Sequence, residues 1–357
     1  MKFIPLYFWY IAKHYIINLF AILFGLSASF AVIDYFQHID KLDVSSSYQI
    51  LYIFFMWQEA LGLLYPLAIV FAIIMTKLAM VKNSTMGAFH AFGYNKKRLF
   101  LPLFTVATLV YGFFIYLHTT EFSYAKEKAQ LLIENQLNAY DVNNIFFKYN
   151  DTFVYIEKLD PIYKRMENIT IFKVEGNQVR YTLKAPFASY SDDEWEAKDA
   201  IVKQHIYKNG KLKKYRIEHK DSVITLKGYK PKIITSLYEG KALNIIDAFN
   251  TWKLFENQHM NSDKIRAAIY NKIVVPLFSL ALALILFFKL PFHARMISFG
   301  LVVATSLGAT FVIWGILFGL NQIGQNGVLI PEITALAPIF ILWSYAVYIY
   351  FSDENKI

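Results

Sequence analysis

The chain contains six long runs of mostly apolar residues, which fall into two groups near its ends. A helix that crosses the hydrocarbon core of a bilayer needs about 20 consecutive apolar residues. Each run is close to that length, so the pattern predicts six transmembrane helices, three on each side of a polar middle segment. The runs cover approximately residues 14–36, 60–81, 99–118, 268–289, 297–320 and 330–351.

The segment ahead of the second run has two interpretations. Residues 50–59 are largely apolar but end in Trp57, Gln58 and Glu59, and Pro66 follows soon after. Proline removes a helix hydrogen bond, and tryptophan favours the membrane surface. We therefore expect an interfacial helix that turns into the membrane before Pro66, with one continuous long helix as the alternative.

The middle segment, residues 121–267, changes from helical to strand periodicity. A polar helical stretch at 121–138 is followed by short runs in which apolar and polar residues alternate. Gly176-Asn177 and Asn209-Gly210 separate pairs of these runs, and Asn-Gly favours the type I′ hairpin turn because both central residues need positive φ. The pattern predicts about eight short strands in an antiparallel sandwich or jelly roll. Helical spacing in residues 243–255 then predicts an amphipathic helix on the membrane surface.

Together these elements predict a membrane α-helical protein with an inserted all-β domain that is similar to a jelly roll. Residues 1–120 would hold the first three spans, with a short inner helix within about 82–98. Residues 121–267 would form the β domain with flanking helices, and residues 268–357 the last three spans.

Charge adds an orientation to this plan. The chain is 56% apolar and only 18% charged, and its net charge is +9. Cytoplasmic loops carry an excess of lysine and arginine, which explains this charge better than nucleic-acid binding does. We therefore expect both termini inside and the β domain outside, in the periplasm of a bacterium. The basic residues lie around the loops after spans two and four (Lys77, Lys82, Lys96, Lys97, Arg98, Lys289, Arg295), whereas acidic residues follow span one and precede span six (Asp34, Asp40, Asp43, Glu332).

The sequence contains no residue set typical of an enzyme. The motifs GxxxxGK[ST], GxGxxG and HExxH are absent, no two histidines lie four residues apart, and there is no cysteine. Ser123 and Lys126 match SxxK without its companion motifs. We expect no catalytic residue, no metal site and no cofactor in this chain. The charged residues Glu59 and Lys77 in the spans are expected to anchor at the membrane interfaces.

The inner loop between spans two and three predicts a short amphipathic helix. Asn83 or Ser84 can cap it, Met86, Phe89 and Phe92 recur at helical spacing, and Gly93 is placed to end it with a left-handed residue. Such a helix either docks in a groove of a cytoplasmic partner or lies on the membrane surface.

Several features together resemble the LptF/LptG permease family, the membrane subunits of the transporter that exports lipopolysaccharide from the bacterial inner membrane. They are the three-plus-three helix plan around a β domain, the segment from Met86 to Tyr94, the strand from Phe153 to Glu157, and residues 271–277 at the start of span four. The Phe-Val-Tyr-Ile-Glu strand and the final helices are more similar to the LptG branch than to the LptF branch. The similarity covers nearly the whole chain.

The resemblance implies a noncatalytic permease subunit that pairs with a second, LptF-like permease. A cytoplasmic LptB-like ATPase dimer, which binds ATP and magnesium, would drive lipopolysaccharide out of the inner membrane. The lipid would then pass to the jelly-roll domains, to an LptC-like bitopic protein and to a periplasmic bridge protein that leads toward the outer membrane.

The resemblance also implies three groups of site residues. For contact with the ATPase these are Thr85, Met86, Phe89, His90, Phe92, Gly93, Lys96, Lys97 and Arg98. Candidates for lipid phosphate are Lys41, Lys126 and Lys128, and candidates for the acyl-chain groove are Phe153, Tyr155, Ile171 and Tyr181. Two positions depart from the family pattern. Thr85 stands where members often carry an acidic residue, and Asp34 stands where some relatives place a lysine for lipid phosphate.

Three alternatives stay open at this point. The chain can be an LptF-type paralogue of the same complex, or a membrane-anchored periplasmic scaffold whose β domain binds protein. A secondary carrier is the third alternative, although few ionisable residues lie within the spans to couple an ion gradient.

Overall fold

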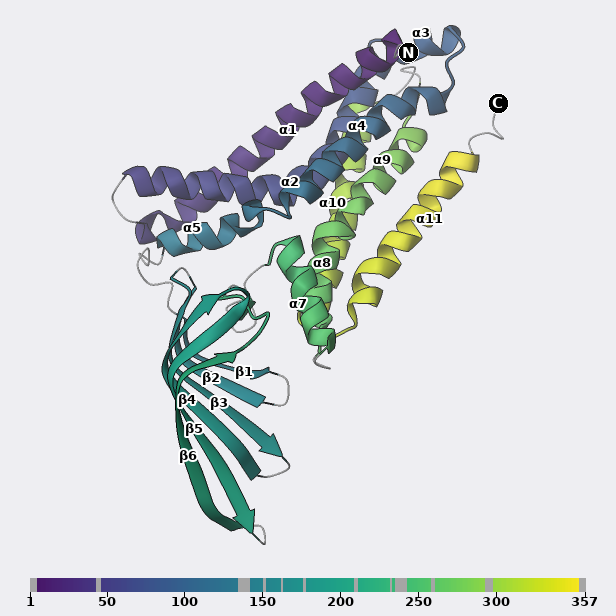
Figure 1. Ribbon diagram of the computed structural model, residues 1–357. Helices are drawn as coiled ribbons and strands as arrows, with labels where there is room; N and C mark the ends of the chain where they lie inside the picture. Colours follow the sequence, from purple (N-terminus) through teal and green to yellow (C-terminus); the bar gives the residue numbers. More distant parts are fainter. Residues whose placement is uncertain are drawn as a thin grey trace. The chain divides into compact units, whose positions relative to one another are not determined.

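The computed structural model divides the chain into two compact units, which are described one at a time (Figure 1). The helical unit comprises Met1–Ala129, Asn244–Ala248 and Ser262–Ile357, and the β unit comprises Gln130–Leu243 and Phe249–Asn261. The structure describes residues 5–42, 46–133, 142–149, 152–161, 163–175, 178–208, 211–231, 233–234, 243–257, 261–292 and 298–352.

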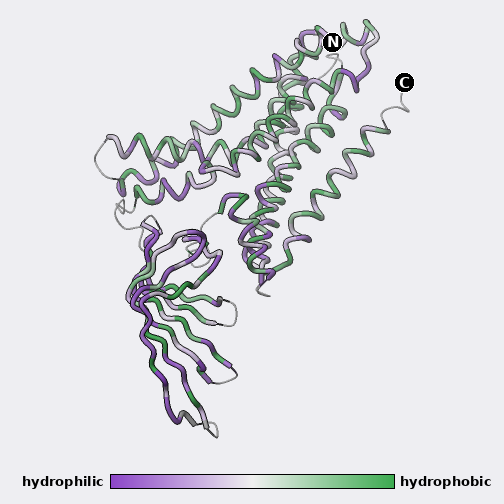
Figure 2. The backbone as a smooth tube through the Cα atoms, in the orientation of Figure 1, coloured by the Kyte–Doolittle hydropathy of each residue, from purple (hydrophilic) through white to green (hydrophobic). Residues whose placement is uncertain are grey.

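Six helical segments among the described residues are long and apolar enough to cross a membrane, which confirms the predicted number. These segments are Leu6–Lys41, Ser46–Lys82, Lys96–Leu117, Asp263–Lys289, Phe299–Gln325 and Glu332–Ser352. Figure 2 shows that these helices are hydrophobic along most of their length. Their elements are α1 (Leu6–His38), η1 (Ile39–Lys41), α2 (Ser46–Lys82), α4 (Lys96–Leu117), α8 (Asp263–Ile273), η3 (Val275–Leu277), α9 (Phe278–Lys289), α10 (Phe299–Gln325), the π-helical η4 (Glu332–Leu336) and α11 (Ala337–Ser352). The shorter elements are α3 (Thr85–Ala91), η2 (Glu121–Tyr124), α5 (Ala125–Ile133) and α7 (Ile245–Asn257).

The expected separate interfacial helix before Pro66 is wrong, because α2 is one continuous helix that contains Pro66. Its 37 residues correspond to about 55 Å at 1.5 Å per residue, well beyond the roughly 30 Å of a bilayer core. Contacts with α1 hold the first part of α2 in place. Tyr35 donates a hydrogen bond to Gln49 at 3.0 Å, and the hydroxyl of Tyr52 donates to Asp34. These contacts stabilise the part of α2 before Pro66, where the local sequence does not favour one continuous helix.

Lys77 does not reach the membrane surface as expected. Its side chain is fully buried in the helical core, and its ammonium donates to the carbonyls of Phe287 and, at 2.5 Å, Leu290. The ring centre of Phe292 lies 3.8 Å from the same nitrogen. The last carbonyls of a helix have no partner within the helix, and here a lysine from α2 binds them at the end of α9.

The β unit contains one antiparallel sheet in which the strands follow their sequence order, β1-β2-β3-β4-β5-β6. The predicted hairpins at residues 176–177 and 209–210 are confirmed by the pairing of Glu175 with Gln178 and of Lys208 with Lys211, although the turn residues lie outside the described ones. The described strands form a meander, with no Greek-key crossover among them. They are β1 (Val142–Tyr149), β2 (Thr152–Asp160), β3 (Arg165–Glu175), β4 (Gln178–Ser191), β5 (Glu194–Lys208) and β6 (Lys211–Thr225).

The described sheet has six strands, which are longer and fewer than the eight or so expected. The sequence alternation breaks within these strands, and the pairing is interrupted there along one line across the sheet. Six residues, one from each strand, lie on this line. None of them has a Cα partner in the register between neighbouring strands, and all six are exposed. Each acts as an extra residue that shifts the alternation by one, so buried positions change phase in mid-strand. Asn144, Asn168 and Asp199 on this line have φ angles of 57°, 52° and 52°. The line consists of Asn144, Glu157, Asn168, Pro186, Asp199 and Asp221.

One face of the sheet forms the core of the β unit. Val154, Ile171, Leu183 and Val202 are consecutive cross-strand partners on this face, and all are buried. A segment after β6 covers part of the same face with the buried side chains of Leu226, Tyr229, Ile233 and Ile234. The indole of Trp195 donates to the carbonyl of Tyr229 at 2.7 Å, which fixes this cover to β5.

Candidate functional site

The inner loop between α2 and α4 forms the predicted short helix, α3. Gly93 has a φ of +82°, as the sequence predicts for a helix end. Its backbone N–H donates to the carbonyl of His90 at 2.9 Å, and Tyr94 N–H donates to Phe89 at 3.1 Å. This pair of bonds is the Schellman motif, which satisfies carbonyls at the helix end. Ser84 precedes the helix in a left-handed conformation and makes no side-chain capping bond, so this part of the prediction is wrong.

The three apolar residues predicted for partner contact differ in exposure. Met86 is 1% exposed and belongs to the core of the helical unit, so its surface is used within this chain. Phe89 is half-buried, with its ring centre 6.0 Å from that of Tyr10. Phe92 is 80% exposed. Thus Met86 holds α3 to the membrane helices, while Phe92 is left largely uncovered by its own chain.

The basic residues after α3 are positioned by a cap and by aromatic rings. Asn95 accepts a hydrogen bond from the backbone of Arg98 at 2.8 Å and so caps α4. Lys97 lies 4.4 Å from the ring centre of Tyr350 in α11, and Lys96 lies 5.1 Å from that of Phe292. The coupling segment, residues 82–98, therefore contacts the inner ends of other helices as well as α2 and α4. Thr85 and His90 also belong to this segment, and His90 is exposed.

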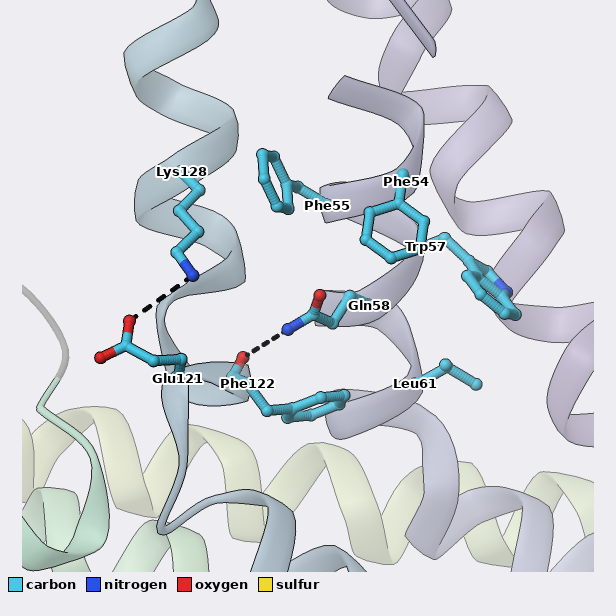
Figure 3. Close-up of a pocket in the computed structure, with 8 residues that line it drawn as sticks. All are labelled: Phe54, Phe55, Trp57, Gln58, Leu61, Glu121, Phe122 and Lys128. Atoms are coloured by element: carbon cyan, nitrogen blue, oxygen red, sulfur yellow. Dashed lines mark hydrogen bonds and ion pairs between the residues drawn. The ribbon is translucent and has the colours of Figure 1, made fainter. Parts of the chain in front are cut away.

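At the other end of the helical unit, an open groove of about 490 Å³ lies between α2 and the η2–α5 segment (Figure 3). We call it the outer groove. Its α2 wall consists of Phe54, Phe55, Trp57, Gln58 and Leu61, and Glu121, Phe122 and Lys128 complete it. Apolar side chains form most of the wall, while the charged groups of Glu121 and Lys128 form an ion pair at 3.5 Å on one side. Gln58 donates to the carbonyl of Phe122 at 3.2 Å and joins the two walls.

The structure separates the three lysines predicted for lipid phosphate. Lys128 lines the outer groove, whereas Lys126 lies on the same helix and interacts electrostatically with Glu59 of α2. Lys41 is exposed in η1. Asp34, the position that departs from the family pattern, accepts the hydrogen bond of Tyr52 and so belongs to the α1–α2 contact.

Further partly buried polar interactions lie at the same end of the helices as the outer groove. Arg266 of α8 forms ion pairs with Asp263, at 2.5 Å, and with Glu332 of η4, which also accepts a hydrogen bond from Tyr270 at 3.0 Å. His118, directly after α4, lies 3.3 Å from the hydroxyl of Ser123. Burial, with a smaller effect of the nearby Lys272, lowers the pKa of His118 to about 4, so the ring is neutral at pH 7.

The four acyl-groove candidates do not share one face of the sheet. Ile171 is buried on the core face, and Tyr181 packs partly against the same core, where burial raises its pKa. Phe153 and Tyr155 lie between the buried positions of β2 and therefore point to the opposite face. There the ring of Phe153 stacks on Phe172 with centres 5.7 Å apart. The four candidates therefore form two pairs, with Ile171 and Tyr181 on the core face and Phe153 and Tyr155 on the opposite face.

A family model described as the lipopolysaccharide export system permease LptF/LptG matches residues 9–351. The chain belongs to the LptF/LptG family. A comparison with curated proteins finds no match.

Membership in the LptF/LptG family decides the general function. The protein is a lipopolysaccharide export permease, a transport subunit that is not itself catalytic. Its six apolar helices agree with a multi-pass protein of the inner membrane, and the separate β sheet lies in sequence between the two groups of three.

Sequence reasoning missed two features of this LptF/LptG chain. We predicted residues 50–59 as a membrane-surface helix and predicted no groove beside it, although the aromatic residues Phe54, Phe55 and Trp57 are typical of a site at the membrane interface. The sequence gives little indication of the ion pair between Arg266 and Glu332, because the two residues are far apart in sequence and meet only when α8 packs beside η4.

Proposed function

We propose that this LptF/LptG chain is the permease subunit of an ABC transporter that extracts lipopolysaccharide from the inner membrane and passes it to a periplasmic bridge. The observation that carries this proposal is the exposed side chain of Phe92 at the end of a helix that is held firmly by its own chain. An apolar side chain at the end of a short amphipathic helix can anchor that helix in a groove of a partner, which supports docking at Phe92.

The contacts of the coupling segment support transmission of force. Met86 ties α3 into the core, and Lys97 lies over the ring of Tyr350 in α11. Lys77, five residues before the end of α2, binds the end of α9. A partner that moves α3 would therefore move the inner ends of several spans together, as an ATPase must do to open and close a permease.

The orientation and the partners follow from the same proposal. The basic loops after spans two and four support an orientation with both termini in the cytoplasm and the β unit in the periplasm. An LptB-like ATPase dimer would bind at the coupling segment and would hold ATP and magnesium. An LptF-like permease would pair with the spans, where α1, α10 and α11 expose many apolar side chains. An LptC-like protein and the bridge protein would meet the β unit.

Within the family we propose the LptG role, because the strand from Phe153 to Glu157 is more similar to that branch. The LptF role is the alternative. Co-expression with one LptF-type and one LptG-type permease distinguishes them, since an LptG-type chain is expected to co-purify with the LptF-type partner in preference to the other.

The coupling role is tested by Phe92→Asp, with Tyr163→Asp as the matched control. Tyr163 is 75% exposed and lies in the β unit, so both changes place a carboxylate on an exposed aromatic position. Because burial of a phenylalanine contributes about 1.5–3 kcal/mol, loss of this contact should weaken ATPase binding roughly tenfold or more. The measurement is the ATPase-to-permease ratio after purification in mild detergent, together with lipopolysaccharide release from proteoliposomes.

The expected result is a low ATPase ratio and little lipid release for Phe92→Asp, with normal values for the control. A normal ratio and normal release for Phe92→Asp would remove the coupling role from α3. Purification with periplasmic proteins and without any ATPase would favour the scaffold alternative.

A further inference from the structure

The outer groove lies at the depth where lipid head groups meet hydrocarbon. In the proposed orientation, exposed Lys82 and the rest of the basic coupling segment mark the inner membrane boundary. A rise of 1.5 Å per residue along α2 gives about 32 Å from Lys82 to Leu61, which lies one helical turn from Trp57. Trp57 therefore lies at the opposite boundary, where aromatic side chains are enriched. Its indole stacks on Phe24 of α1, with ring centres 5.8 Å apart, so its position is fixed by a second helix.

The wall of the groove is suited to hydrocarbon. Phe54 is 50% exposed, and Phe55, Leu61 and Phe122 are half-buried around the same space. A volume of about 490 Å³ is sufficient for a head group and the first part of an acyl chain. An apolar wall at the interface favours a membrane lipid over a soluble molecule, because a lipid is present there at high concentration and covers the wall with its own chains.

The polar side of the groove carries one charge of each sign. Lys128 and Glu121 form their ion pair at 3.5 Å, with 36% and 65% of their side chains exposed. Lysine binds phosphate as a point charge, and a carboxylate accepts hydrogen bonds from an ammonium group. A head group with a phosphate and a primary amine complements this pair, whereas a purely anionic head group meets repulsion from Glu121.

We propose that the outer groove binds one zwitterionic glycerophospholipid, with its phosphate on Lys128, its ethanolamine nitrogen on Glu121 and its acyl chains on the aromatic wall. The phospholipid comes from the leaflet at the outer ends of the helices, an assignment that rests on the proposed orientation. It is a lipid bound beside the transport path, distinct from the lipopolysaccharide that the family exports.

The experiment is native mass spectrometry of the detergent-purified complex after addition of phosphatidylethanolamine or phosphatidylglycerol with identical acyl chains. The wild type should retain phosphatidylethanolamine about tenfold better than phosphatidylglycerol, the size of one charge-assisted hydrogen bond. Lys128→Gln should reduce retention of both lipids, because the phosphate contact is common to them. Glu121→Gln should remove the preference by admitting phosphatidylglycerol.

Lys264→Gln is the matched control, since Lys264 is an exposed lysine of α8 that does not line the groove. It should bind both lipids as the wild type does. Equal retention of the two lipids by the wild type, or equal effects of Lys264→Gln and Lys128→Gln, would overturn the proposal. Displacement of the bound phospholipid by inorganic phosphate or by lipopolysaccharide at equal concentration would also overturn it. Failure of the coupling role would appear separately, in the Phe92→Asp assay, which does not depend on the groove.

Discussion

Replacement of Lys77 by methionine tests whether a buried lysine stabilises the end of α9. Methionine has a similar length and is apolar, so Lys77→Met removes the charge and leaves little empty space. The carbonyls of Phe287 and Leu290 then lose the ammonium that binds them in a fully buried site. A buried acceptor without a partner costs about 1–3 kcal/mol, so two of them correspond to about 2–6 kcal/mol. Loss of the contact with the ring of Phe292 adds about 0.5–2 kcal/mol.

An opposing effect makes this prediction informative. A buried charge is costly to desolvate, and well-packed apolar residues often replace buried ion pairs without loss of stability. Here the acceptors are backbone carbonyls, which stay in place when the lysine is removed, so we expect the loss of their partner to exceed the gain from desolvation. The thermal unfolding midpoint in detergent should fall by several degrees for Lys77→Met. Lys82→Met, at an exposed position five residues later in the same helix, serves as the control. A midpoint for Lys77→Met equal to or above that of the control would refute the reasoning.

Two further predictions concern the outer ends of the helices. A Cβ at Gly324 would lie 2.3 Å from the hydroxyl oxygen and 3.3 Å from the Cβ of buried Thr334, so Gly324→Ala should destabilise the protein by about 1–3 kcal/mol. Gly319→Ala, whose Cβ meets no described atom within 4 Å, should not, and calorimetry of both variants decides between these outcomes. Burial lowers the pKa of His118 to about 4, so the unfolded chain binds a proton at a higher pH than the folded one and stability should fall as pH decreases from about 6.5 to 4. His118→Gln should reduce this fall in unfolding titrations, and an unchanged pH dependence would argue against a buried neutral ring.

The number and order of the membrane helices could be predicted because each depends on a property of the local sequence. A span of about 20 apolar residues is visible without any tertiary contact, and the left-handed end of α3 is visible in Gly93. The continuity of α2 was not visible. It depends on Tyr35 and Tyr52, whose hydrogen bonds to another helix compensate for the local signals around Pro66. The burial of Lys77 was hidden for the same reason, since its partners lie 210 and 213 residues away.

The candidate residues show the same division between local and tertiary signals. The position of the coupling segment followed from its spacing and from the resemblance, but the exposure of Phe92 and the burial of Met86 depend on how α3 packs. Lys126 and Lys128 are two residues apart on α5 and therefore lie on different faces of the helix. Of these two lysines, Lys128 lines the groove. For the strands, alternation could assign faces only up to the next interruption of the pattern.

That interruption explains why fewer and longer strands are observed than the alternation predicts. The alternation changes phase near Asn144, Pro186 and Asp199, and a change of phase within one strand looks in the sequence like the boundary between two strands. The acyl-groove candidates all lie on one side of this line, so simple alternation separates them: Phe153 and Tyr155 flank buried Val154, and Ile171 is the cross-strand partner of Val154. Positive φ at Asn144 and Asp199 uses the residue types that tolerate this conformation best. A sheet whose strands all shift phase on one line keeps one continuous core face despite the broken pattern, so its register can be predicted only when neighbouring strands are considered together.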